Sequence, residues 1–397
     1  MVLGPTVYWS QRGRQTDVPL RTVSLKVPSH SDLTSPSGDL PQKGALGGKA
    51  VQPGAAPGPP TAVRISPDLV LSAAGRLVSQ ANTNVEVAAK RLVASAPEHG
   101  IDLSLIWCTV EPRHGRKPAS VRQACMAVLG AGRTAMLFVS EPPAGGEPGD
   151  PAAALAERVA CIDAACEHLG RAMSDRVSIA QSLPDPVETW TVRALEQARF
   201  VKVGDLSYLR REAGPLPRSA SSRHAKVPLA QIETGAVLEP GVTVSRLADL
   251  QPEMIDSLVL EALERSYVDT MDCPELCGLR ATRDVLDSHR DTGEFDPRTW
   301  WMLFLNGQPH GCAFFSNCPE LRSAELVYLG LSPELRGRGL GRLMLCKGLE
   351  EVRRQHPSWA MTLAVDHRNT PALRLYASLG FRPFGERVAM VRPVGKA

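Results

Sequence analysis

The chain has 397 residues, of which 43% are hydrophobic, and a formal net charge of only +3. This length allows two domains of about 150 residues or more, and the near-neutral charge gives no electrostatic case for nucleic acid or a membrane surface as a partner. No run approaches the roughly 20 apolar residues that span a bilayer, and no apolar leader stands at the N-terminus. The scattered cysteines are typical of reduced thiols, so we expect a cytoplasmic protein without a metal site.

Residues 1–60 mix proline, glycine, serine and charge without periodicity, and we expect them to form a disordered tail. A first folded domain is predicted at 61–212, where apolar periodicity indicates alternating helices and strands. The predicted elements are a strand at 62–66, helices at 69–79 and 85–96, strands at 103–110 and 134–140, a helix ending near 171, a strand at 176–181 and a helix ending at 199.

A linker rich in proline, serine and positive charge is predicted at 213–240, ahead of a second domain at 241–397. In the second domain an Asn306-Gly307 pair between two apolar runs indicates a hairpin turn. The predicted elements are a strand at 242–246, helices at 249–264 and 282–290, strands at 299–305 and 309–316, and a strand at 359–365. Both domains mix helices and strands, which predicts an α/β fold with a mixed sheet.

Residues 324–344 are the most informative stretch, because apolar residues give way there to Ser-Pro and then to three glycines within five positions. This pattern predicts a buried strand, a tight turn and the start of a helix. Backbone N–H groups from Gly337 to Gly341 would then lie at a helix N-terminus, where they attract an anion such as pyrophosphate. Two other phosphate-binding loops are alternatives. A Walker loop needs Gly-Lys-Ser/Thr, which is absent, and a Rossmann turn needs an acidic residue at the end of a second parallel strand, about twenty residues after its glycines.

The motif Arg336-x-x-Gly339-x-Gly341 resembles the acyl-CoA loop of the GCN5-related N-acetyltransferases, the GNAT family. A second motif at 369–381 resembles the GNAT segment in which an Asn and a Tyr face the cofactor. Because the two motifs agree, the second domain is identified as a member of this family. The resemblance implies a catalytic GNAT domain at 241–397 that uses acetyl-CoA as co-substrate.

The end of the first domain repeats the end of the second when Phe200 is placed opposite Phe381. The matched pairs are Arg193 with Arg374, Gly204 with Gly385, Asp205 with Glu386 and Arg211 with Arg392. The shared order of helix, aromatic residue, strand, Gly-acidic turn and final strand indicates two GNAT-like domains in tandem. An unrelated α/β domain with a similar ending is the alternative.

The first copy lacks the features of an acyl-CoA site. Its counterpart of the glycine loop is proline-rich, and Glu141, Glu147 and Asp150 in it would repel a pyrophosphate. The second motif also differs in the first copy, with Leu195 opposite Tyr376 and Glu188 opposite Asn369. We therefore expect a degenerate, catalytically silent domain that acts as a scaffold or as a wall on the substrate side.

The resemblance also assigns residues that would hold acetyl-CoA. The loop would bind pyrophosphate through its N–H groups and arginines, and the strand before it would bind the pantetheine arm through its backbone and polarise the acyl carbonyl. The residues so assigned are Val327, Tyr328, Leu329, Arg336, Gly337, Arg338, Gly339, Leu340, Gly341, Arg342 and Asn369. Asn369 has an alternative role as a helix N-cap, because Asn before Thr-Pro-Ala is a good helix start.

Tyr376 is the candidate acid that returns a proton to the departing thiolate. It lies seven residues after Asn369, which is two helical turns on the same face, so both side chains would point toward the cofactor. The alternative is that Tyr376 only packs.

Glu325 is the candidate base for the amine. It stands eleven residues before the arginine of the glycine loop, the spacing at which histone-acetyltransferase members carry a strand glutamate. Alternation predicts that it shares a face with Val327 and Leu329, where apolar neighbours would raise its pKa. A solvated strand-end glutamate is the alternative. His310 and Asp366 are weaker candidates, since turn and strand-end positions explain them.

Substrate recognition in the family usually involves the loop between the first two helices of the domain. Here that loop offers an acidic and aromatic group that suits a cationic amine: Tyr267, Asp269, Asp272 and Glu275. The sequence therefore predicts an N-acetyltransferase that moves acetyl from acetyl-CoA to a primary amine of a small molecule or protein by direct attack. We expect a monomer or homodimer.

Two other functions remain open at this point. The first is acetylation of an amino-sugar thiol, because the actinobacterial mycothiol synthases also resemble tandem GNAT proteins with one active half. The second is a non-catalytic acyl-CoA-binding sensor.

Overall fold

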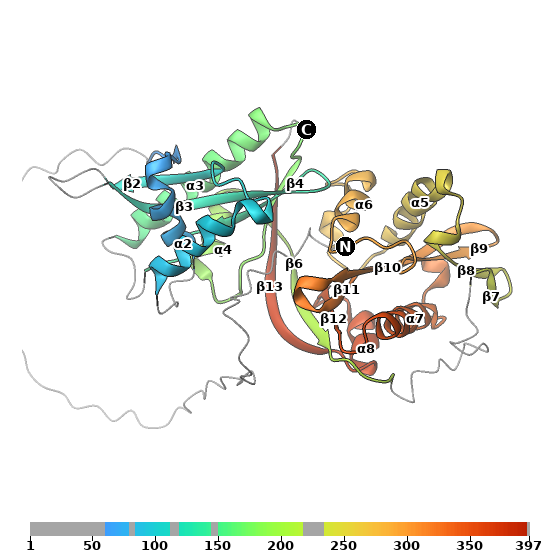
Figure 1. The fold of residues 1–397 in the computed structure, drawn as a ribbon. Helices are drawn as coiled ribbons and strands as arrows, with labels where there is room; N and C mark the ends of the chain where they lie inside the picture. Colours follow the sequence, from blue (N-terminus) through green and yellow to red (C-terminus); the bar gives the residue numbers. More distant parts are fainter. Residues whose placement is uncertain (1–59, 79–83, 112–118, 144–149, 217–233, 395–397) are drawn as a thin grey trace, which may run out of the picture. The chain divides into compact units, whose positions relative to one another are not determined.

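The order of helices and strands is repeated once along the chain, as a computed structural model of the protein shows (Figure 1). The structure describes residues 60–78, 84–111, 119–143, 150–216 and 234–394. These residues belong to one compact unit. The tail expected at 1–60 lies outside them except for Pro60, and so does most of the linker expected at 213–240.

The first half contributes six strands and four helices to the described residues. The strands are β1 (Val63–Arg64), β2 (Ile106–Glu111), β3 (Ser120–Gly130), β4 (Thr134–Val139), β5 (Ile179–Ser182) and β6 (Val201–Arg211). The helices are α1 (Val70–Leu77), α2 (Val85–Ser95), α3 (Pro151–Ala172) and α4 (Thr189–Gln197).

The second half follows the same order, with seven strands and four helices described. The strands are β7 (Ala236–Glu239), β8 (Val242–Arg246), β9 (Trp301–Leu305), β10 (Gln308–Cys318), β11 (Ser323–Leu331), β12 (Ala360–Asp366) and β13 (Arg382–Pro393). The helices are α5 (Ile255–Tyr267), α6 (Thr282–Arg290), α7 (Leu340–Gln355) and α8 (Thr370–Ser378). The predicted hairpin turn between β9 and β10 is confirmed, since Asn306 and Gly307 both have positive φ, 50° and 80°.

Two strands lie where the sequence predicts none. β7 falls inside the expected linker, and β3 was hidden because Arg122 and Gln123 interrupt its apolar run. Both polar side chains find partners in the fold: Arg122 pairs with Glu157 at 3.0 Å, and Gln123 Oε1 accepts a hydrogen bond from Ser140 at 2.8 Å. A buried strand can therefore contain polar residues that have hydrogen-bond partners, even though these residues break the apolar pattern from which a strand is predicted.

The described strands form one mixed sheet, in the order β1-β2-β3-β4-β5-β13-β6-β12-β11-β10-β9-β8-β7. The last strand of each half lies in the other half, because β6 pairs with β12 and β13 pairs with β5. At the centre β6 and β13 pair with each other in antiparallel register. This reciprocal exchange, together with the repeated element order, confirms that two similar α/β units follow each other in tandem.

Helices cover both faces of the sheet in the second half (Figure 1). On one face Leu326 of β11 packs in a core with α7 and α8, and on the other Val327 packs with α5 and α6. In the first half α3 and α4 build a separate core against β2 to β5. Within the described ranges, no helix is both long and apolar enough to cross a bilayer.

A glycine in α7 sets how closely this helix approaches the sheet. A Cβ added at Gly348 would collide with the ring of the buried Phe315 in β10. We expect Gly348→Ala to lower the free energy of unfolding by about 1–3 kcal/mol through overpacking, measured by urea denaturation. Gly75→Ala in α1 is the matched control, since its Cβ would meet open space, and it should be neutral or stabilise by up to about 1 kcal/mol. Equal effects at the two positions would contradict this packing.

Candidate active site

The parting of β11 from β12 creates the candidate site. These parallel strands pair only from Ser323–Ala360 to Glu325–Thr362, after which β12 continues to pair with β6 as far as Asp366. The backbone groups of β11 beyond Glu325 therefore have no strand partner on the β12 side among the described residues. Since buried N–H and C=O groups require partners, this edge is available to hydrogen-bond an extended ligand.

A β-bulge in β11 stands at the same point. Phe314 of β10 lies opposite Tyr328 and Phe315 opposite Leu326, so Val327 is the extra residue. Val327 and Tyr328 consequently pack in the same core with α5 and α6, whereas Leu329 packs on the α7 side. The predicted alternation is thus right for Val327 and wrong for Leu329, because a bulge shifts every later side chain to the other face.

The N-terminus of α7 lies directly after this strand. Gly337 and Gly339 have positive φ, 72° and 79°, and Gly339 is the N-cap without any side-chain cap. A Cβ at Gly341 would make only an ordinary contact, at 3.7 Å from Leu331. The predicted strand, turn and helix start are confirmed, and the first N–H groups of a 16-residue helix are left for an anion.

The arginines of the loop contact protein groups in this structure. The guanidinium of Arg336 donates to the carbonyl oxygens of Leu331, Ser266, Val268 and Asp269, at distances from 2.6 to 3.0 Å. It thereby satisfies carbonyls at the end of α5 and ties that helix to the glycine loop. Arg338 pairs with Glu239 at 2.7 Å, and Arg342 donates to Ser378 Oγ at 2.6 Å. The backbone N–H groups are consequently the clearer donors for a pyrophosphate.

The second motif forms the start and middle of α8. Asn369 is the N-cap, since its Oδ1 accepts the N–H of Ala372 at 3.3 Å, so the capping alternative describes its side chain in this structure. Tyr376 is 7% exposed and packs against Phe381, with ring centroids 5.8 Å apart. Burial, followed by the nearby Asp272 charge, raises the pKa of its hydroxyl, which favours the protonated form that an acid needs.

Glu325 stands where β11 and β12 separate, in their last residue pair. It is 7% exposed, and burial raises the pKa of its carboxyl to about 7, which agrees with the predicted direction. Ser316 lies opposite it in β10, with a buried Oγ that has no hydrogen-bond partner among the described residues. A carboxyl with this pKa can take up and release a proton near neutral pH.

The two weaker candidates are engaged by neighbours. Arg265 donates to His310 Nε2 at 3.0 Å, and because a guanidinium only donates, the ring proton lies on Nδ1 and points to Ser332 Oγ at 2.9 Å. Burial and then Arg265 lower the pKa of His310, which keeps it neutral. Asp366 is fully buried, and its carboxylate accepts hydrogen bonds from the backbone N–H and from the guanidinium of Arg368.

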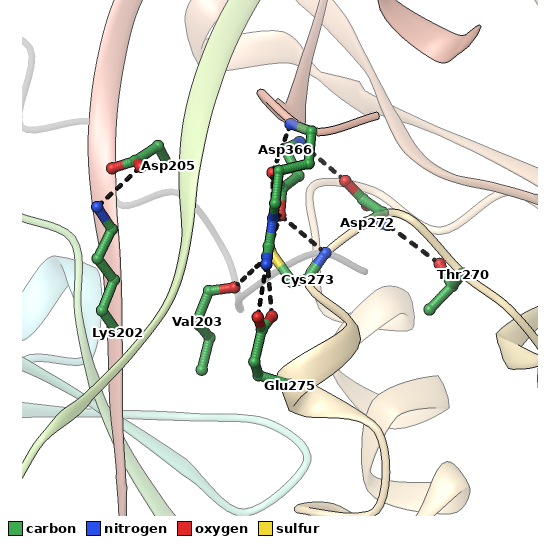
Figure 2. Close-up of polar contacts among 9 residues, drawn as sticks. Lys202, Val203, Asp205, Thr270, Asp272, Cys273, Glu275 and Asp366 are labelled. Atoms are coloured by element: carbon green, nitrogen blue, oxygen red, sulfur yellow. Dashed lines mark hydrogen bonds and ion pairs between the residues drawn. The ribbon is translucent and has the colours of Figure 1, made fainter. Parts of the chain in front are cut away.

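The residues predicted to bind the acceptor have different surroundings. Tyr267 is largely buried, its hydroxyl has no partner within the described part of the chain, and its ring meets Tyr328 edge-on at 6.4 Å. Asp269 has a positive φ of 51°. Asp272 accepts the N–H of Asp366 (Figure 2), and Glu275 is paired with Arg368. The loop is thus ordered by its own acids, a feature that single-residue reasoning missed.

Two parallel strands of the first half, β4 and β5, also separate, but here a side chain bridges them where they separate. β4 and β5 also pair over only three residues, but the pairing of β3 with β4 has no bulge. Ser182 Oγ donates to the Leu137 carbonyl at 3.0 Å, across the point where these strands separate. At the start of α3, Asp150 accepts the N–H of Ala152 at 2.9 Å and caps the helix with an acidic group. These differences agree with a degenerate first copy.

Comparison with known proteins agrees with this geometry. A sequence model described as the acetyltransferase (GNAT) family matches residues 263–381. Residues 263–381 form a GNAT acetyltransferase domain. The solved GCN5-related N-acetyltransferase from Sphaerobacter thermophilus aligns with a TM-score of 0.50 and 16% identity, over 86% of this chain and 97% of that one. The fold of this solved structure is therefore similar to that of both halves of the chain.

The curated relatives of this chain share a name that is more specific than that of the family. A mycothiol acetyltransferase from Gordonia bronchialis is 30% identical over 162 residues, which cover 36% of this chain and 50% of that protein. One from Acidothermus cellulolyticus is 44% identical over 68 residues, which cover 17% of this chain and 20% of that protein. The chain therefore spans about half or less of the length of these relatives.

The raised pKa of Glu325 predicts a pH-dependent stability. The unfolded carboxyl titrates near pH 4.3 and the folded one at about 7, so the folded state binds the extra proton between these values. Stability should be highest below this window and fall as pH rises through it, by about 3 kcal/mol relative to Glu325→Gln. Urea unfolding of both proteins from pH 4.5 to 7.5 measures this. A constant difference between them over that range would contradict a buried, raised-pKa carboxyl.

Proposed function

We propose that the chain transfers an acetyl group from acetyl-CoA to a primary amine, at one site in its second half. The observation that carries this proposal is the parting of β11 and β12 beside the uncapped N-terminus of α7. An extended arm that ends in a phosphate group fits this pair of features, because one supplies strand-like backbone partners and the other an anion site. The GNAT match of residues 263–381 supports the same ligand.

In this proposal the backbone of 327–329 hydrogen-bonds the pantetheine arm, and the N–H groups of 337–341 bind the pyrophosphate. Glu325 takes the proton from the incoming ammonium group, which its pKa of about 7 allows. Tyr376 gives its proton to the departing thiolate and regains one from solvent. Attack by the amine on the thioester is direct, so no cysteine of the chain is acylated.

A more specific acceptor is the amine of an amino-sugar thiol, the unacetylated form of mycothiol. The observation that favours it is the name shared by the curated relatives, which are 30% to 44% identical over the segments compared. The acidic side chains of Asp269 and Asp272 near the proposed site suit a cationic amine in either case. Since this acceptor carries a thiol of its own, its acetylation should be followed by product mass rather than by thiol release.

The anion site can be tested by charge alone at Gly341. Glu and Gln at this position occupy the same space, but only Glu places a negative charge at the first turn of α7. We expect Gly341→Glu to bind acetyl-CoA at least about tenfold more weakly than Gly341→Gln, measured by calorimetry, with similar unfolding midpoints. Wild-type protein should bind one acetyl-CoA per chain. Equal affinities of the two variants, or two equal sites per chain, would contradict a single anion site here.

The acid role of Tyr376 predicts a loss of turnover without a loss of binding. With acetyl-CoA and a panel of amines that includes the unacetylated mycothiol precursor, wild-type protein should give acetylated product by mass spectrometry. Tyr376→Phe keeps the ring packed on Phe381 and should lower kcat by about 10²-fold or more, with unchanged acetyl-CoA affinity. Full turnover of this variant would remove the proposed acid, and acetyl-CoA binding without product on any amine would favour a sensor.

A further inference from the structure

A single arginine joins the loop 269–277, which carries most of the residues predicted to bind the acceptor, to the first half of the chain. Arg368, just after β12, donates to both carboxylate oxygens of Glu275, at 2.5 and 2.8 Å. The same guanidinium donates to the carboxylate of Asp366 at 2.6 Å and to the carbonyl oxygen of Val203 in β6 at 2.8 Å. The loop, the end of β12 and a strand of the other half therefore meet in one network (Figure 2).

Asp366 extends this network to the backbone of the loop. Its Oδ2 accepts the N–H of Cys273 at 3.1 Å, and its own N–H donates to Asp272 Oδ1 at 2.9 Å. Asp366 has no exposed surface, so its negative charge requires a partner, and Arg368 supplies it. Loss of Arg368 would leave this buried carboxylate without its cation and would release Glu275 at the same time.

The first half contributes shape as well as a carbonyl group. A Cβ added at Gly204 in β6 would lie 2.9 Å from both Asp366 Oδ2 and Cys273 Sγ, closer than such atoms approach. Only glycine lets β6 come this near to the loop. Cys273 is itself fully buried, with a positive φ of 46°, so the loop follows a defined and uncommon path at this contact.

The other end of the loop is held from the acyl-CoA side. Arg336 binds the carbonyl oxygens of Val268 and Asp269, at 2.6 and 3.0 Å. Met271 lies between these two anchors with its side chain about half exposed, and the side chain of Val268 at the first anchor is about half exposed too. A loop that is fixed at both ends and exposes side chains between them offers a preformed surface to a ligand.

We propose that Arg368 is a positioning residue, through which the first half of the chain fixes the loop 269–277 that binds the acceptor amine. This inference rests on the proposed function for its effect on turnover. Among the described residues, the side chain of Arg368 contacts Glu275, Asp366 and Val203 and none of residues 327–342, which hold acetyl-CoA in the proposed function. The neighbouring Asn369 caps α8 with its side chain, so we expect the effect of Arg368 to fall on the acceptor. The catalytically silent half thus contributes to recognition of the second substrate.

The test compares Arg368→Gln with Lys202→Gln in the full-length protein. Lys202 pairs with Asp205 at 2.8 Å on the same strand as Val203 but does not contact the loop, so it is the matched control (Figure 2). Hydrogen–deuterium exchange of peptides over 269–277 should speed up about tenfold or more in Arg368→Gln, since charge-assisted bonds are lost. Lys202→Gln should leave it unchanged.

Kinetics with the unacetylated mycothiol precursor as the probe give a second readout. Arg368→Gln should raise KM for this acceptor about tenfold or more, with kcat and the acetyl-CoA Kd changed less than about threefold. Arg368→Lys, which retains the charge without the bidentate geometry, should recover part of the loss. Gly204→Ala should mimic Arg368→Gln, because it displaces the loop from the other side.

Two results would overturn the proposal. One is unchanged exchange over 269–277 in both Arg368→Gln and Gly204→Ala. The other is a loss of acetyl-CoA affinity equal to the loss in acceptor KM, which would indicate general damage to the fold. If wild-type protein binds no acetyl-CoA or does not turn over the probe, the proposed function or acceptor fails, yet the exchange experiment still decides whether Arg368 fixes the loop.

Discussion

The second half of the chain depends on two parallel strands that stop pairing after three residues. Continued pairing of β11 with β12 would satisfy their backbone groups and leave no room for a ligand. The bulge at Val327 prevents this by turning β11, while Phe314 and Phe315 of β10 hold it from the other side. The same bulge sets where Glu325 lies, since it is the last residue before the parting. One local irregularity thus places the open backbone, the buried carboxyl and the following glycine loop together.

This arrangement requires support for β12, which loses its neighbour on one edge. β6 of the first half pairs with β12 along Met361–Asp366 and supplies that support. The exchange of last strands therefore makes the two halves interdependent: neither half of the sheet is complete without a strand from the other half. Because β6 also carries Val203 and Gly204, the strand that supports β12 reaches the loop 269–277 as well. The first half is consequently a structural part of the candidate site in the second half.

The features predictable from sequence were the local ones. Three glycines after an apolar strand allow few conformations other than a turn into a helix, and the Asn and Tyr of the second motif fall on one helix whatever surrounds it. The contacts of Arg336 were not predictable, because its partners at the end of α5 and just after that helix lie about 70 positions earlier in the chain. The predicted sheet face of Leu329 was wrong for a similar reason. A bulge depends on how β11 pairs with β10, and the alternation of residues within β11 contains no information about that pairing.

The two halves differ in how they provide hydrogen-bond partners for backbone groups where the parallel strands separate and where the next helix begins. Each unpaired buried backbone group costs about 1–3 kcal/mol, and the first half avoids this through Ser182, which bridges β5 to the Leu137 carbonyl, and Asp150, which caps α3. The second half has Leu363 where the register places Ser182, and Gly339 where α3 has Asp150. A ligand that supplied partners to the open groups of the second half would bind only the folded state and would therefore stabilise it. Binding and folding would then be coupled in this half, whereas the first half has satisfied the same groups with its own side chains.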